Sequence, residues 1–298
     1  MKVGRRDVRV SSPDKVLFPQ IGLTKAGLAE YYARVSEFSL PHLRGRPLNL
    51  DVYPQGVEAD GFFQQHASRW FPDWVDRVRV PKKGGNVEHA VANRADTLVY
   101  LAGQNTVTLH TWPSRADQLD RPDRLVFDLD PPEGDFARAR RAARVLGDLL
   151  RELALEPFAM VTGSKGIHVV APIQRRQSFP EARELARGVA EVLVAREGEL
   201  VTSEWMKDKR DGRILVDVRA TRGMSVVAPY SVRPRAKAPV ATPVHWEELS
   251  DRRLAPGRWT VSSVFERLDR EGDAWAGIAA AARALGEPSR LLRELQRD

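Results

Sequence analysis

Residues 124–219 alternate short apolar runs with two long helical runs, and no other feature constrains the fold as strongly. The apolar runs have the length and composition of strands, and they lie at 124–130, 158–162, 167–172 and 213–219. Helical spacing marks the arginine-rich segment Phe136–Leu153 and the segment Pro180–Arg196. Helices that cross over between strands predict a sheet of the α/β type.

Weaker patterns lie on both sides of this region. Thr24 is placed to cap a helix from Lys25 to about Phe38, and residues 46–112 have the texture of strands and loops. A further strand is expected near 224–230, and the proline- and alanine-rich segment 233–245 predicts an extended strap on the surface. The last 40 residues are expected to be helical and to dock through Leu268, Trp275, Ile278 and Leu285. Without a break in composition or an internal repeat, we expect one compact unit.

The composition narrows the chemistry and the partners. The chain of 298 residues has 47 basic and 40 acidic side chains, a net charge of +7, and no cysteine. A basic surface favours polyanionic partners such as nucleic acid, although solubility alone can explain it. The lack of cysteine excludes disulfides, thiolate zinc sites and cysteine nucleophiles. No apolar stretch suits a membrane helix or a secretory signal, so we expect a cytoplasmic protein with no membrane partner.

The segment RLVFDLDPP carries the strongest local signal. Side chains two apart on a strand share a face, which places Asp128 and Asp130 together about 7 Å apart. Neighbouring carboxylates repel each other unless a cation lies between them, and hard divalent cations take oxygen ligands. Pro131 and Pro132 end the strand, so the pair is expected at a rim of the sheet. The alternative is a polar edge strand with a solvated turn.

Asp217 is a third carboxylate, in the strand RILVDVRA, where it lies among valines. Three aspartates without cysteine suit a two-metal site for phosphoryl transfer, in which cations hold the attacking oxygen and the leaving pyrophosphate. The alternative is an ion pair between Asp217 and a nearby arginine.

The segment TGSKGIH lies between these strands and has the residue types of a phosphate loop. Its glycines allow close backbone approach, Ser164 can donate a hydrogen bond, and Lys165 brings a positive charge. His168 follows on a strand and could reach a triphosphate oxygen. The segment is not a P-loop, because GxxxxGK[ST] is absent and a strand follows. A plain Gly-Ser turn with a half-buried histidine remains the alternative.

Three further features are weaker. His110 shares a strand face with threonines and suits a substrate site or a polar surface equally. Phe62 and Phe63 could stack on a base if exposed, although two core phenylalanines are the default. A basic hairpin tip suits phosphates or is simply solvated, and it comprises Lys207, Lys209 and Arg210.

Taken in order, these segments resemble the primase-polymerase domain associated with bacterial DNA ligase D, of the archaeo-eukaryotic primase superfamily. The resemblance runs nearly end to end, through SSPDKVLFP, GLTKAGLAEYY, GFFQQH, RLVFDLDPP, TGSKGIHVVAP, LVDVRA and APYSVR. It implies a mixed α/β fold with an RRM-like catalytic sheet and an N-terminal α/β module. The single domain would then comprise a module of about 1–110, a catalytic core of about 111–235, and a C-terminal strap and helices of about 236–298.

The resemblance also implies roles for individual residues. The catalytic, metal-binding residues would be Asp128, Asp130 and Asp217. The nucleotide-binding residues would be His110, Ser164, Lys165, His168 and Arg233. Lys15 and Lys25 fall where the family grips the 5′-phosphate of a downstream strand, and Phe62 and Phe63 match an aromatic pair that stacks on template bases.

The implied function is template-directed nucleotidyl transfer that fills gaps or extends ends in DNA break repair by non-homologous end joining. It would use two ions of manganese or magnesium, NTP or dNTP, and DNA with a 5′-phosphate at a gap or break. Ku and a DNA ligase are possible partners, and the protein would be associated with the nucleoid. Two alternatives stay open, a DNA-end-binding module that has lost catalysis and a phosphatase of the haloacid dehalogenase type.

The sequence departs from the family pattern in two places. After the third aspartate the family usually has an Arg-Asn or Gln-Asn pair, whereas this chain reads Val218-Arg219-Ala220-Thr221 and is one residue shorter. Relatives often carry a basic residue near position 51, where this chain has Asp51, so we assign no nucleotide contact there. The ligase and 3′-phosphoesterase modules have no counterpart, so we expect a stand-alone polymerase or an excised domain.

Overall fold

The computed structural model describes residues 1–82, 84–132 and 134–297, and its chain divides into two units. The first unit comprises Met1–Asp117, Ser225–Ala241 and Trp259–Arg270. The second unit comprises Gln118–Met224, Thr242–Arg258 and the chain from Glu271 onward. The chain therefore passes more than once between the units, which explains why composition shows no boundary.

A six-stranded sheet forms the centre of the second unit, in the order β15-β16-β12-β14-β13-β18. Its pairs are antiparallel except for β15 and β16, which run parallel. The strands are β12 (Arg124–Asp130), β13 (Phe158–Val161), β14 (Ile167–Pro172), β15 (Val201–Thr202), β16 (Ile214–Val218) and β18 (Thr242–Val244). The mixed α/β class is thus confirmed.

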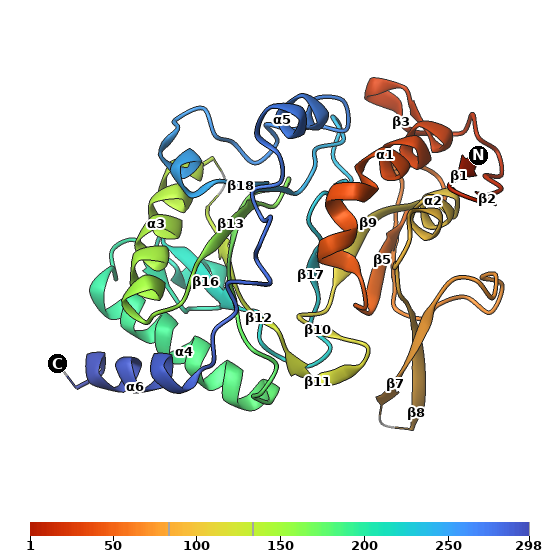
Figure 1. Ribbon diagram of the computed structural model, residues 1–298. Helices are drawn as coiled ribbons and strands as arrows, with labels where there is room; N and C mark the ends of the chain where they lie inside the picture. Colours follow the sequence, from red (N-terminus) through yellow and green to blue (C-terminus); the bar gives the residue numbers. More distant parts are fainter. Residues whose placement is uncertain (83, 133, 298) are drawn as a thin grey trace. The chain divides into compact units, whose positions relative to one another are not determined.

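Helices α3 (Phe136–Glu152) and α4 (Phe179–Arg196) pack against this sheet (Figure 1). Alanine and leucine recur at helical spacing along α3 and are buried, whereas its arginines lie on the other side. Ser178 begins α4 with a capping box, because its Oγ accepts from the Glu181 N–H and the Glu181 carboxylate accepts from the Ser178 N–H. The remaining elements of the unit are β11 (Gln118–Pro122), η2 (Lys207–Lys209), η3 (Trp246–Ser250) and α6 (Gly286–Leu295).

The first unit is built on a four-stranded sheet in the order β17-β9-β5-β6. These strands are β5 (Leu48–Val52), β6 (Phe62–Gln64), β9 (Thr106–Thr111) and β17 (Val226–Val227). Two helices, α1 (Lys25–Leu43) and α2 (Ala95–Gly103), pack against each other. The smaller elements are β1 (Lys2–Val3), β2 (Arg6–Asp7), β3 (Val16–Phe18), η1 (Pro19–Ile21), β4 (Leu23–Thr24), β7 (Arg77–Lys82), β8 (Gly85–Ala90), β10 (Ser114–Arg115) and α5 (Val264–Glu271).

Two tyrosines of α1 fasten distant parts of the first unit. Tyr31 Oη donates to the Tyr230 carbonyl at 2.8 Å, and Tyr32 Oη donates to the Val107 carbonyl at 2.6 Å. Burial raises the pKa of Tyr32 to about 12, so its hydroxyl keeps the proton that it donates. These bonds join α1 both to β9 and to the segment that returns to the unit at residue 225.

The predicted elements agree with the structure only in part. Residues 46–112 were expected to be strands and loops, but Ala95–Gly103 forms helix α2, whose continuous apolar run is buried as a helix and not as a strand. The strand at 124–130 and the Thr24 cap are confirmed, with Thr24 Oγ1 accepting from the Gly27 N–H at 3.2 Å. Helix α1 continues beyond Phe38 to Leu43, through Pro41, because Leu40 and Leu43 are buried and packing outweighs the proline.

The predicted surface strap is wrong. Ala238, Val240 and Ala241 are fully buried, and Thr242–Val244 forms β18 at one edge of the six-stranded sheet. An edge strand tolerates Pro243, because one side of its backbone needs no partner in the sheet. The C-terminal docking residues are buried as expected, but α5 and α6 are separated by a non-helical stretch.

Within the described part of the chain, no helix combines the length and apolarity that a bilayer crossing requires.

Candidate active site

Three polar side chains lie in a row across the centre of the second unit's sheet. Asp128 on β12 is the register partner of His168 on β14 and also of Asp217 on β16. Side chains directly opposite on antiparallel strands point to the same face about 5 Å apart. The antiparallel pairing therefore brings together residues that are up to 89 positions apart in the chain.

An arginine links the two carboxylates of this row. Arg219 Nη2 lies 2.7 Å from Asp217 Oδ2 and 3.6 Å from Asp128 Oδ2. On the other side, His168 Nε2 lies 3.5 Å from Asp128 Oδ1. The ion pair that the sequence left open for Asp217 is thus present, and Arg219 is a member of the cluster that sequence reasoning did not select. Its position two residues after Asp217, on the same strand face, was the available signal.

Burial and neighbouring charges act in opposite directions on Asp217. Burial raises the pKa of its carboxyl above the ordinary value, the positive charge of Arg219 lowers it, and the carboxylate of Asp128 raises it again. The net effect is a raised pKa of Asp217, so it costs free energy to keep this carboxylate ionised. A cation between the two carboxylates reduces that cost.

Asp130 lies further along β12 and has a different partner. Its register partner on β16 is Leu215, and Arg210 Nη1 lies 3.6 Å from Asp130 Oδ2. Arg210 in turn donates from Nε to the Glu204 carbonyl at 3.0 Å. Of the predicted basic tip, Arg210 therefore faces the aspartates, whereas Lys207 and Lys209 are exposed on η2.

The arrangement of the aspartates suits a cation, since one guanidinium nitrogen already lies between Asp128 and Asp217. Among the residues that the structure describes, however, no group of three or more His, Asp or Glu side chains is close enough to hold a metal ion together. The structure thus shows a shared position for one positive charge at Asp128 and Asp217, with Asp130 paired separately.

The predicted phosphate loop directly precedes β14, the strand that carries His168. Thr162 organises it, because its Oγ1 donates to the Gly166 carbonyl at 3.1 Å and accepts from the Gly166 N–H at 3.3 Å. A Cβ added to Gly166 would lie 2.3 Å from the Leu129 carbonyl oxygen, so the loop backbone runs directly against β12. Ser164 is half-buried and Lys165 is exposed on this loop. Sequence reasoning did not assign Thr162 its structural role.

His168 is a buried member of the row. Its side chain is 4% exposed, and no hydrogen-bond partner of Nδ1 is found within the described residues. A buried imidazole nitrogen without a partner is costly, which favours a role for His168 beyond core packing.

The remaining predicted site residues belong to the first unit and form their own groups. His110 Nε2 lies 3.0 Å from Asp51 Oδ2 across the β5–β9 pair. The ring of Phe63 stands edge-on to His110 with centroids 5.5 Å apart. Phe62 and Phe63 are 52% and 50% exposed, so the alternative of two core phenylalanines is wrong. Asp51, which we set aside at the sequence level, is the direct partner of His110.

Arg233 lies in the same part of the first unit. Its positive charge lowers the pKa values of Tyr32 and Tyr53, against the larger upward effect of burial. The negative charge of Asp51 raises the pKa values of the same two tyrosines. Asp51 and Arg233 therefore both lie near Tyr32 and Tyr53.

Lys15 and Lys25 lie side by side in the first unit. The Lys25 N–H donates to the Lys15 carbonyl at 2.8 Å, and Lys15 Nζ donates to the Pro54 carbonyl. Burial first, and then the charge of Lys15, lower the pKa of Lys25. Lys25 also begins α1, where the helix dipole is positive. Two lysines whose charges interact at a helix start favour binding of an anion.

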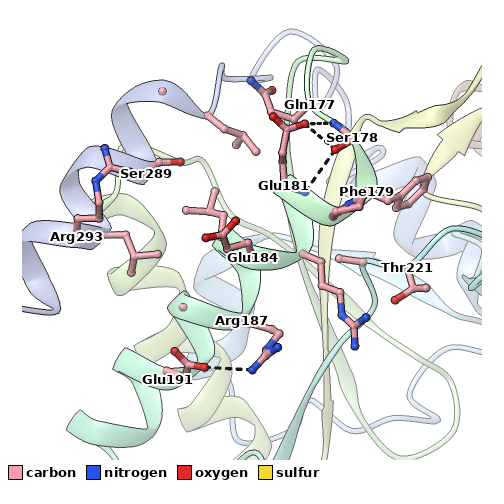
Figure 2. A pocket seen from close by; sticks show the side chains of 18 of the residues that line it. Gln177, Ser178, Phe179, Glu181, Glu184, Arg187, Glu191, Thr221, Ser289 and Arg293 are labelled. Atoms are coloured by element: carbon pink, nitrogen blue, oxygen red, sulfur yellow. Dashed lines mark hydrogen bonds and ion pairs between the residues drawn. The ribbon is translucent and has the colours of Figure 1, made fainter.

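A groove of about 1040 Å³ lies elsewhere in the second unit, between α4 and α6 (Figure 2). Its lining mixes both signs of charge, and Arg187 is paired with Glu191 at 3.6 Å. None of the predicted site residues lines it. Size alone therefore does not make this groove the reactive site.

Comparison with known proteins identifies the family. The family model described as "LigD, primase-polymerase domain" matches residues 24–275. The chain belongs to this family. Its six-stranded sheet and aspartate row are thus those of a primase-polymerase family member.

Similar proteins agree with this assignment. The multifunctional non-homologous end joining protein LigD of Mycolicibacterium smegmatis is 34% identical, over 92% of this chain and 36% of that protein. The bifunctional non-homologous end joining protein LigD of Bacillus subtilis is 30% identical, over 89% of this chain and 43% of that protein. This family member therefore spans between a third and a half of the length of these relatives.

A solved structure supports the fold. The polymerase domain from Mycobacterium tuberculosis ligase D, in complex with DNA, matches with a TM-score of 0.87 and 33% identity. The match covers 93% of this chain and all of that one.

Proposed function

We propose that this chain is a template-directed nucleotidyltransferase of the primase-polymerase type, which fills gaps or extends ends during DNA break repair by non-homologous end joining. One observation carries the proposal, the row of His168, Asp128 and Asp217 across three paired strands beside a glycine loop. Membership of the LigD primase-polymerase family and the likeness to a polymerase domain in complex with DNA support it.

Asp128, Asp130 and Asp217 are proposed to hold divalent metal ions, manganese or magnesium and two in number. When bound, such ions stabilise the developing charge on the attacking and leaving oxygens of phosphoryl transfer. The carboxylates of Asp128 and Asp217 are held in place before any ion binds, because β12 is paired with β14 on one side and with β16 on the other. His168 is buried against Asp128 and orients that carboxylate.

The groups of the two units suggest the remaining roles. Ser164, Lys165 and His168 are proposed to contact the triphosphate of an incoming NTP or dNTP, and His110 and Arg233 to contribute further nucleotide contacts. Lys15 and Lys25 suit a 5′-phosphate at a gap or break, because an anion reduces the repulsion between their positive charges. The exposed rings of Phe62 and Phe63 suit stacking on template bases.

The setting of the reaction is also a proposal. Relatives named as non-homologous end joining proteins suggest that Ku and a DNA ligase act with this chain, in the cytoplasm at the nucleoid. The predicted single domain over residues 1–298 would act as one polymerase module.

Primer extension tests the proposal directly. We would use a gapped DNA with a 5′-phosphate, manganese, and either NTPs or dNTPs, and compare the unmodified protein with Asp128→Ala. Extension by the unmodified protein alone would support both the polymerase activity and the metal role of Asp128.

Two other results would change the conclusion. Failure of both proteins to extend the primer, with DNA binding retained, would favour a DNA-end-binding module. Release of phosphate without extension would favour a phosphatase. Loss of DNA binding by Asp128→Ala would indicate a folding defect, which a thermal melt identifies.

A further inference from the structure

Arg219 is fixed by the same strand pairing that fixes the aspartates. Its backbone N–H donates to the Val126 carbonyl at 2.8 Å, which continues the pairing of β16 with β12 one residue beyond Val218. The alternation of side chains puts Arg219 on the face that carries Asp217. The guanidinium can therefore reach Asp217 along its own strand and Asp128 across the pair.

One nitrogen of this guanidinium serves both carboxylates. Nη2 lies 2.7 Å from Asp217 and 3.6 Å from Asp128, while the three side chains are only 29%, 11% and 24% exposed for Arg219, Asp217 and Asp128. Partial burial strengthens such contacts, because water screens them less than at an open surface. Arg219 Nε is itself buried, with no partner found within the described residues. The side chain is thus packed into the cluster and is not a loose surface group.

The oxygens that Arg219 contacts are the oxygens that a divalent cation would use. A metal ion between Asp128 and Asp217 would lie within a few ångströms of the guanidinium, and two positive charges at that distance repel each other. The close ion pair with Asp217 would have to be given up as the metal binds.

We propose that Arg219 is a built-in counter-cation of the aspartate row, which stabilises Asp128 and Asp217 without metal and is displaced when a divalent ion binds. Arg219 is accordingly a positioning residue that sets how much free metal is needed to load the carboxylates. This inference rests on the proposed metal-binding role of Asp128 and Asp217.

Metal affinity of the full chain provides the test. Titration calorimetry with Mn²⁺ alone, without nucleotide or DNA, gives the dissociation constant of the unmodified protein and of Arg219→Gln. The variant is expected to bind Mn²⁺ roughly tenfold more tightly, since the loss of the competing ion pair and the loss of the charge repulsion both favour the metal. Arg219→Lys keeps the positive charge and is expected to stay within about threefold of the unmodified protein.

Arg222→Gln is the matched control. It removes the same charge three residues later, where Arg222 pairs with Asp120 at 2.5 Å. Its dissociation constant for Mn²⁺ is expected within about twofold of the unmodified value. Equal tightening by Arg219→Gln and Arg222→Gln would show a general effect of net charge and overturn the inference, as would no tightening by Arg219→Gln.

A second measurement observes the displacement and does not depend on the folding of Arg219→Gln. With ¹⁵N-labelled arginine, the Nε resonance of Arg219 is assigned by its absence in Arg219→Lys and followed during titration with Mg²⁺. It is expected to shift in step with metal binding. A resonance that does not move while Mg²⁺ binds would overturn the inference.

Asp128→Ala separates this inference from the proposed function. If the unmodified protein binds Mn²⁺ no better than Asp128→Ala, the proposed metal site itself fails. If Asp128→Ala loses binding and Arg219→Gln does not gain it, only the role of Arg219 fails.

Discussion

At the scale of single residues, Gly166 marks a close approach of two backbone segments in the candidate site. A Cβ at this position would lie 2.3 Å from the Leu129 carbonyl oxygen, between Asp128 and Asp130 on β12. The contacting atom belongs to the backbone of a paired strand, so it cannot rotate away as a side chain would. The loop of Ser164 and Lys165 therefore keeps its position only with glycine here.

We expect Gly166→Ala to lower the free energy of unfolding by roughly 2 kcal/mol, as overpacking of a fixed site does. Nucleotide incorporation should fall as well, because the loop moves away from β12. Urea denaturation and primer extension measure the two effects. Gly286→Ala is the control, since a Cβ there meets nothing within 4 Å. A stability for Gly166→Ala equal to that of the control would contradict the argument.

Burial of Lys25 sets the stability of the fold against the proposed binding of a 5′-phosphate. Its side chain is 4% exposed, and burial together with Lys15 lowers its pKa from 10.5. The folded protein therefore holds this proton less tightly than the unfolded chain does. Below the folded pKa both forms are charged and the penalty is constant. As the pH rises from the folded pKa towards 10.5, the folded lysine loses its proton first and the penalty is lifted.

Lys25→Met is accordingly expected to raise the free energy of unfolding at pH 7. The gain should shrink at pH 10.5, because the folded lysine loses its proton before the unfolded one as the pH rises. The same substitution should weaken the preference for a 5′-phosphorylated gap. Denaturation at the two pH values and binding to phosphorylated and unphosphorylated gaps test both parts. If the variant is less stable than the unmodified protein at pH 7, burial of the charged Lys25 does not destabilise the fold.

The sequence could predict the aspartates and left open an arginine as the partner of Asp217, but it did not identify Arg219 or its contact with Asp128. Asp128 and Asp130 follow from strand alternation, which depends only on spacing. The contact of Arg219 with Asp128 depends on strand register and on a side-chain rotamer, neither of which a single sequence encodes locally. Asp51 was missed for the same reason, since its contact with His110 joins two strands 59 residues apart.

At the scale of elements, the prediction succeeded where local pattern and packing agree. Strand β12 has the predicted bounds because its apolar run ends abruptly at two prolines. The end of α1 and the burial of β18 were not predictable, because both are decided by distant partners that outweigh proline. The two-unit division was equally hidden, since each unit is assembled from separated segments of the chain.

Helix α3 gives a direct test of such packing. Gly147 is inside this helix, where glycine costs about 1 kcal/mol relative to alanine. The ring of Trp246 occupies the space that a Cβ would need, at 1.9 Å from the added atom. Close contact between α3 and the η3 segment is therefore the reason for glycine at this position.

Gly147→Ala should destabilise the protein by roughly 2 kcal/mol in spite of its better helix propensity. Gly188→Ala in α4 is the matched comparison, because its Cβ would meet the flexible end of Leu292 at 2.7 Å. The leucine can rotate, so a change within about 0.5 kcal/mol is expected there. Thermal or urea denaturation gives the order of the two effects, and the reverse order would refute the packing argument.

At the scale of the whole molecule, the positive charge links the proposed function to the salt dependence of DNA binding. The net charge of +7 does not by itself distinguish a DNA-binding protein from a soluble basic one. The difference lies in whether particular lysines release counterions from DNA when the complex forms. Lys15 and Lys25, held together at the start of α1, are the residues for which this can be decided.

Binding of a gapped DNA with a 5′-phosphate should weaken linearly in a plot of log affinity against log salt concentration. Each phosphate contact that is removed should lower the magnitude of the slope by about 1. Lys15→Gln is expected to lower the magnitude of the slope by about 1 on the phosphorylated gap. Without the 5′-phosphate, the same substitution is expected to change the slope less. Lys2→Gln removes an equal charge from an exposed strand and should leave the slope unchanged. Equal slopes for all three proteins would mean that the DNA does not use Lys15, because counterion release counts contacts made in the complex and not the charge carried by the free protein.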